Sequence, residues 1–144
     1  MTTKTIAENL LAEMAEAGDA TARCELGSRL SSDVGVGQDR DDHKASELYK
    51  LAADGGSVNA QHNYGCHLQK QERHREALEY FQKASYAGLP AATHALAQLW
   101  WTGFYNEEGK FIRDVEKSKD CYERAAEAGF LPAVKFVETA RCAG

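Results

Sequence analysis

The chain has 144 residues, of which 43% are hydrophobic and 27% charged, and its formal net charge is -5. This length and composition predict one globular domain that needs no disulfide or metal to be stable. Lysine and arginine do not cluster, so no nucleic-acid partner is expected. The N-terminal residues lack the layout of a signal peptide, and no stretch approaches the ~18 apolar residues of a membrane helix, so no membrane association is expected either.

The four cysteines are far apart in the sequence and form no CxxC pair. Their spacing predicts neither a zinc ribbon nor a redox motif. Free thiols of this kind are typical of a reducing compartment, so we expect a cytoplasmic protein. The cysteines are Cys24, Cys66, Cys121 and Cys142.

Apolar residues at helical spacing predict roughly eight helices, whereas the two prolines and the lack of a long alternating run make strands unexpected. Asp42 is predicted to cap the third helix, and Pro90 suits the first turn of the sixth. A longer loop is expected over residues 102–113. The predicted helices cover about residues 5–17, 19–30, 42–54, 57–70, 73–87, 90–101, 114–128 and 132–142.

Four glycines, each placed just after a predicted helix, indicate an internal repeat. A glycine after a helix commonly adopts the left-handed conformation that ends it. Gly18 and Gly56 are 38 residues apart, Gly56 and Gly88 are 32 apart, and Gly88 and Gly129 are 41 apart. An alanine follows each glycine by four residues, at Ala22, Ala60, Ala92 and Ala133. Helix pairs repeated at this period predict an α-solenoid.

A second repeated position holds a small residue, at Gly27, Gly65 and Ala97. Small residues there would let the two helices of a pair approach closely. The equivalent position of the last helix is Glu138. A charged residue at that point indicates a terminal, water-facing surface, which solenoids need.

The pattern resembles the Sel-one-like repeat (SLR) family, a relative of the tetratricopeptide repeats. The second repeat has a shortened loop, the third an enlarged loop with Ala97 in place of glycine, and the fourth is half a repeat. The first repeat carries the family pattern almost whole, as Ala22, Leu26-Gly27, Leu30, Gly35-Val36-Gly37, Asp39, Lys44-Ala45, Ala52-Ala53 and Gly56.

The resemblance implies an all-α fold, a right-handed superhelix of about three and a half helix pairs. Within one repeat domain, residues 5–18 would form a capping helix and residues 19–56, 57–88 and 89–129 three repeats. Residues 130–144 would form the final half repeat. Some secreted bacterial members bridge each helix pair with two cysteines. This chain lacks that pairing, so Cys121 is interpreted as a small buried hydrophobic residue.

The resemblance also implies a scaffold that binds another protein, with the first helix of each pair lining a concave face. Trp101 would then be the anchor for a peptide or protein loop; the alternative is a solvated inner face without a ligand. The residues predicted to point into this face are His62, Cys66, His94, Gln98, Trp101 and Lys135.

The enlarged loop after Trp101 is rich in aromatic residues. Phe104 and Tyr105 are predicted to contact the partner, because binding residues concentrate on loops. The alternative is that these rings, with Phe111, fold the loop into a self-packed cap. Trp100 falls in the column of Leu30 and Leu68, so it is predicted to belong to the core.

Cys24, His62, Cys66 and His94 would fall on adjoining concave positions, and two cysteines with two histidines suit tetrahedral zinc. Against this, helices ~8–10 Å apart would have to converge on one ion. No catalytic motif is present, so the chain is predicted not to be an enzyme, with neither metal nor cofactor.

The last helix presents Val134, Phe136 and Val137 with no following helix to cover them, which predicts a partner site or a homodimer contact. The chain is therefore expected to be a monomer or a weak homodimer. The main functional hypothesis is a protein-interaction scaffold. The alternatives are a bacterial immunity protein that occludes a toxin or enzyme, and a metal-binding or hydrolytic enzyme on the same scaffold.

Overall fold

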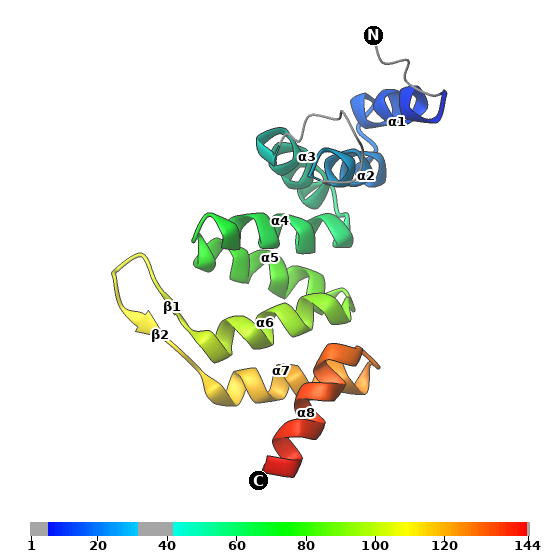
Figure 1. The fold of residues 1–144 in the computed structure, drawn as a ribbon. Helices are drawn as coiled ribbons and strands as arrows, with labels where there is room; N and C mark the ends of the chain where they lie inside the picture. The colour runs from blue at the N-terminus through cyan, green and yellow to red at the C-terminus, as the bar shows by residue number, and fades with distance from the viewer. Residues whose placement is uncertain (1–5, 32–41, 144) are drawn as a thin grey trace. The chain divides into compact units, whose positions relative to one another are not determined.

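The computed structural model describes residues 6–31 and 42–143, and over these residues the chain forms eight helices and one short hairpin (Figure 1). The predicted all-α class is confirmed. None of the described helices is long and apolar enough to cross a membrane. The helices are α1 (Ile6–Glu16), α2 (Ala20–Ser31), α3 (Asp42–Asp54), α4 (Val58–Lys70), α5 (His74–Tyr86), α6 (Pro90–Thr102), α7 (Val115–Glu127) and α8 (Leu131–Ala143).

The chain divides into two compact units, residues 1–64 and residues 65–144, and α4 contributes to both. The predicted glycine loop at Gly35-Val36-Gly37 and Asp39 lies outside the described residues. Asp42, predicted as a cap, instead lies in the first turn of α3.

The four predicted glycine junctions are confirmed, and all four have the same geometry. The φ angles of Gly18, Gly56, Gly88 and Gly129 are 99°, 95°, 97° and 84°. At Gly56, the glycine N–H donates to the carbonyl of Ala53 and the next N–H donates to the carbonyl of Ala52, both at 3.0 Å. The same pair of hydrogen bonds recurs at the other three glycines. This is the Schellman motif, which satisfies the last carbonyls of a helix.

In the first unit, α2 packs on α3 through the small residue at Gly27. A Cβ atom on Gly27 would lie 2.9 Å from the ring of Tyr49, closer than real contacts allow. The Tyr49 hydroxyl donates to the Ser28 hydroxyl at 3.1 Å. The predicted close approach of these two helices therefore occurs.

The inward face of α3 differs from the prediction. The helical spacing of Ala45, Leu48, Leu51 and Ala52 predicts that all four point inward, but Leu51 is half exposed and Leu48 only partly buried. The face is instead formed by Ala45, Tyr49 and Ala52. These residues are separated by four and three positions, which brings them to one side of a helix, whereas Leu51 lies about 100° away from Ala52.

In the second unit, the same contact recurs at Gly65 and changes at Ala97. A Cβ atom on Gly65 would lie 2.6 Å from the ring of Phe81, which is fully buried. In the third repeat, the buried hydroxyl of Ser118 on α7 donates to the carbonyl of Ala97 on α6 at 2.7 Å. A hydrogen bond therefore ties α6 to α7 where the small residue is alanine.

The loop after α6 contains two strands, which the sequence analysis did not expect. β1 (Phe104–Tyr105) and β2 (Phe111–Ile112) pair in antiparallel fashion and project beside α6 and α7 (Figure 1). Two residues per strand are too few to show alternation in the sequence. The turn is fixed by Asn106, whose side-chain oxygen accepts from the N–H groups of Glu108 and Lys110, both at 2.9 Å.

Candidate partner-binding surface

The predicted site residues of α6 share one side of that helix. His94, Gln98 and Trp101 are separated by four and three positions, a spacing that aligns side chains on a helix. Gln98 and Trp101 are exposed, and His94 is half-buried. The face therefore offers an amide and an indole to solvent beside a partly covered imidazole.

Trp101 is a fixed aromatic surface rather than a freely rotating one. Its side chain is 43% exposed. The Phe136 ring meets it edge-on at 5.9 Å, and the Arg113 guanidinium lies 5.3 Å from the ring centre. Arg113 is itself held, because its Nε donates to the carbonyl of Trp101 at 2.6 Å. An indole held in this way loses little conformational freedom when a partner covers it.

Five rings, here called the aromatic row, contact one another in sequence from Phe130 through His94 to Trp101. His94 contacts Phe130 at 5.1 Å and Tyr122 at 5.6 Å. Tyr122 stacks on Phe136 at 3.8 Å with an angle of 18°, and Phe136 reaches Trp101. The aromatic row is formed by Phe130, His94, Tyr122, Phe136 and Trp101.

Burial within the aromatic row shifts the protonation of its polar members. It lowers the pKa of His94 and raises the pKa of Tyr122, in both cases because the charged form loses water. Sequence analysis missed Tyr122. The available signal was its place in the repeat, where it occupies the column of Tyr49 and Phe81.

The hairpin residues divide between the two hypotheses made for this loop. Tyr105 is exposed and pairs with Phe111 at 5.1 Å. Phe104 is only 3% exposed, because its ring packs 5.8 Å from Trp100. The prediction that Phe104 offers its side chain to a partner is therefore wrong, and its ring belongs to the core with Trp100.

The remaining predicted positions lie on α4 and α8. Lys135 is exposed on α8, and Cys66 on α4 is half-buried, with burial raising the pKa of its thiol. His62 belongs to the first unit, where burial lowers the pKa of its imidazole. Nearby, the side-chain amide of Asn63 donates to the buried thiol of Cys24 at 3.7 Å.

The structure gives the zinc hypothesis no support. Within residues 6–31 and 42–143, no three side chains of His, Cys, Asp or Glu lie close enough together to hold a metal ion. All four cysteines are free thiols.

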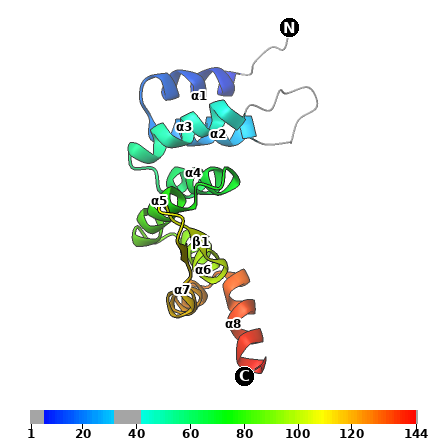
Figure 2. The same ribbon diagram turned by 90° about the vertical axis from the view of Figure 1, so that its left-hand side faces the viewer.

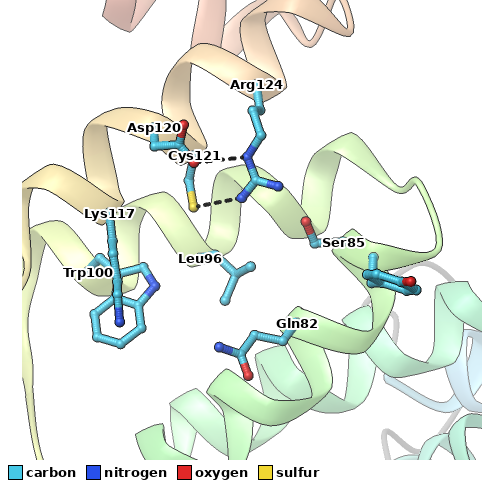
Figure 3. A pocket seen from close by; sticks show the side chains of 9 residues that line it. Gln82, Ser85, Leu96, Trp100, Lys117, Asp120, Cys121 and Arg124 are labelled. Carbon is cyan, nitrogen blue, oxygen red and sulfur yellow. Dashed lines mark hydrogen bonds and ion pairs between the residues drawn. The ribbon is translucent and has the colours of Figure 1, made fainter.

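A hollow of about 320 Å³ lies among α5, α6 and α7, and sequence analysis did not foresee it (Figure 3). Arg124 lies at its edge, where it pairs with Asp120 at 3.2 Å and donates to the Cys121 thiol at 3.4 Å. Burial raises the pKa of that thiol and Arg124 opposes the shift. Lys117 is placed 4.6 Å from the Trp100 ring. These cations are already engaged by their own neighbours.

Two solved structures with similar folds are Sel1-like repeat proteins. A crystal structure of a Sel1 repeat protein from Oxalobacter formigenes is 26% identical with a TM-score of 0.67, and the match covers 90% of this chain and 95% of that one. A protective antigen from uropathogenic Escherichia coli strains, which displays an SLR fold, is 23% identical with a TM-score of 0.75. That match covers 87% of this chain but 26% of the antigen. No curated protein matches the chain.

The sequence model of the Sel1 repeat family matches three consecutive segments of the chain, residues 20–57, 58–89 and 90–130. Together these segments span most of the sequence, and each contains one helix pair and ends at or just after a glycine junction. The chain therefore belongs to the Sel1 repeat family.

Proposed function

We propose that this chain is a non-enzymatic scaffold that binds a partner protein through one surface of its second unit. Sel1 repeat proteins generally serve as protein-interaction scaffolds. The surface proposed here consists of Gln98 and Trp101 on α6, Lys135 on α8 and Tyr105 at the hairpin. We keep the division into a capping helix, three repeats and a half repeat as part of this proposal.

The observation that carries the proposal is the fixed, exposed indole of Trp101. Tryptophan is enriched among the residues that dominate binding energy at protein interfaces. Its neighbour Trp100 is buried, whereas Trp101 is held open to solvent by Phe136 and Arg113. Gln98, on the same side of α6, and Lys135, next to Phe136 in the chain, would supply the polar rim that such an anchor needs.

The test compares two exposed aromatic residues of the second unit. The immobilised chain is incubated with a lysate of its native host, and retained proteins are quantified by mass spectrometry. Trp101→Ala is expected to lose the retained partner, with an affinity at least about tenfold lower, equivalent to ~1.4 kcal/mol. The matched control is Tyr86→Ala on α5, where the side chain is 96% exposed.

Circular dichroism separates binding from folding in this experiment, because Trp101 is partly exposed and its removal should leave the helices intact. If the partner is retained equally by wild type and Trp101→Ala, the surface proposed here is not the binding surface. If Tyr86→Ala loses the partner and Trp101→Ala keeps it, the partner binds the face of α5 instead.

A further inference from the structure

A groove of about 360 Å³ lies between α7 and α8. The two helices cross steeply, since Figure 2 shows α7 nearly end-on while α8 runs down the page. At ~30 Å³ per water molecule, the groove has room for on the order of a dozen waters, or more than one side chain. Its apolar lining is Trp101, Val115, Tyr122, Phe136, Val137 and Ala140.

The repeat explains why this groove is open. One repeat earlier, the positions equivalent to Ala140 and Arg141 are Leu99 and Trp100, which are both buried. In that repeat β1 also packs against α5. On α8, alanine and arginine replace the two large apolar side chains, and no described segment covers α7, the helix equivalent to α5, as β1 covers α5. Of the predicted apolar edge on the last helix, Phe136 and Val137 line this groove and Val134 does not.

The first helix carries an apolar stripe that faces solvent. Ile6, Leu10 and Met14 are 88%, 54% and 41% exposed. They follow one another at four-residue spacing, so they lie along one side of α1. Glu13 and Glu16 border this stripe. An amphipathic helix of this kind is a typical occupant of a hydrophobic groove.

The charges of the two surfaces are opposite. Within Ile6–Glu16 the helix has three glutamates and no basic residue. The groove has Lys119 and Arg141 at its rim with one carboxylate, Glu123, and Arg113 lies on the Trp101 ring. Complementary charge steers association and fixes which surfaces meet.

From these features we infer that α1 of a second copy of this chain docks in the groove between α7 and α8. The stripe supplies the large aliphatic side chains that Ala140 and Arg141 do not. Because the two surfaces are different, the contact is heterologous, and each copy keeps one free groove and one free α1. Association is therefore head-to-tail and continues beyond the dimer unless the geometry closes a ring.

The test measures the mass of the full chain by sedimentation velocity over a range of concentrations. Wild type is expected to form species that grow with concentration. Leu10→Glu spoils the helix stripe and Ala140→Glu places a carboxylate inside the groove, so each variant alone should weaken association at least tenfold. Leu131→Glu is the matched control, because Leu131 is an exposed apolar residue of α8 outside the groove and should leave association unchanged.

Mixing the two variants gives the decisive result. The chain with Leu10→Glu keeps an intact groove and the chain with Ala140→Glu keeps an intact α1, so an equimolar mixture should form dimers and nothing larger. A symmetric contact between like surfaces would not be restored by mixing, and that outcome would overturn the inference. A wild-type chain that stays monomeric up to ~1 mM, where even a contact of ~4 kcal/mol is visible, would also overturn it.

A peptide of residues 5–18 identifies the occupant independently of oligomer size. Its binding should shift tryptophan emission to shorter wavelength, because Trp101 lines the groove and is partly exposed whereas Trp100 is buried. The shift should be absent in Ala140→Glu. No shift at any peptide concentration would overturn the inference that α1 occupies the groove. The proposed scaffold function would stand in that case, because the retention of a lysate protein by wild type and Trp101→Ala is measured without the peptide.

Discussion

The contact between Gly65 and Phe81 gives the sharpest test of the packing described above. We expect Gly65→Ala to destabilise the protein although alanine is the better helix former. The new Cβ would lie 2.6 Å from the Phe81 ring, whereas carbon atoms in good contact are ~3.5–4.0 Å apart. The fully buried ring would therefore have to move by about 1 Å in a packed core.

The magnitude follows from two opposing terms. Overpacking of a core costs about 1–3 kcal/mol, and replacing glycine by alanine inside a helix gains about 1 kcal/mol. The net loss of unfolding free energy should therefore be up to about 2 kcal/mol. In a Phe81→Leu background, the shorter side chain leaves room for the methyl group, so Gly65→Ala should become neutral or stabilising by up to ~1 kcal/mol. The coupling energy between the two positions would then be about 2 kcal/mol.

The assay is urea unfolding followed by far-UV circular dichroism for wild type, both single variants and the double variant. If the slope of unfolding free energy against urea concentration is the same in all four proteins, the variants share the same folded and unfolded states. If Gly65→Ala had the same effect in both backgrounds, the ring contact would not be the reason for glycine, and the close-approach argument would fail.

Three further predictions each concern a single residue. Ser118→Ala should lower the unfolding free energy by about 0.5–1.5 kcal/mol, because it removes a buried hydrogen bond between α7 and the Ala97 carbonyl of α6, and the same urea titration measures this. His94 has a pKa below its ordinary value of 6.5, so the unfolded chain takes up the proton first and stability should fall as the pH drops through 6.5 toward the folded pKa. His94→Gln should flatten, without abolishing, the thermal-melting dependence on pH between about 7 and 5, because the pKa of His62 is lowered too. Cys142 is exposed whereas Cys24 and Cys121 are buried, so a thiol reagent should modify Cys142 first, and Cys142→Ser should remove that fast phase from peptide mass spectra.

The helix junctions could be predicted from the sequence because their causes are local. A glycine that must adopt positive φ, followed at fixed spacing by alanine, is visible without knowing any long-range contact. The same applies to Gly27 and Gly65, since the repeat itself shows that only small residues are tolerated there. Trp100 was likewise assigned to the core from its column alone.

The features that the sequence did not predict depend on contacts between distant residues. Tyr122 and Phe136 stack although they lie on different helices, and nothing in the order of residues specifies that geometry. Phe104 and Tyr105 are adjacent aromatic residues with opposite fates, because a strand sends successive side chains to opposite faces. The groove beside α8 became interpretable only when Ala140 and Arg141 were compared with Leu99 and Trp100.

The two ends of each helix pair differ: the glycine junctions at one end are uniform, and the connections at the other end vary in length. Residues 17–19, 55–57, 87–89 and 128–130 are all three-residue connections with the same hydrogen bonds. At the opposite end, α4 and α5 are joined by residues 71–73, whereas residues 103–114 between α6 and α7 have room for a hairpin. The glycine connections therefore keep the same length and geometry, and the connection at the other end can change its length without disturbing them. An engineer who wishes to graft a recognition loop onto this protein should replace residues 71–73 and leave every glycine junction untouched.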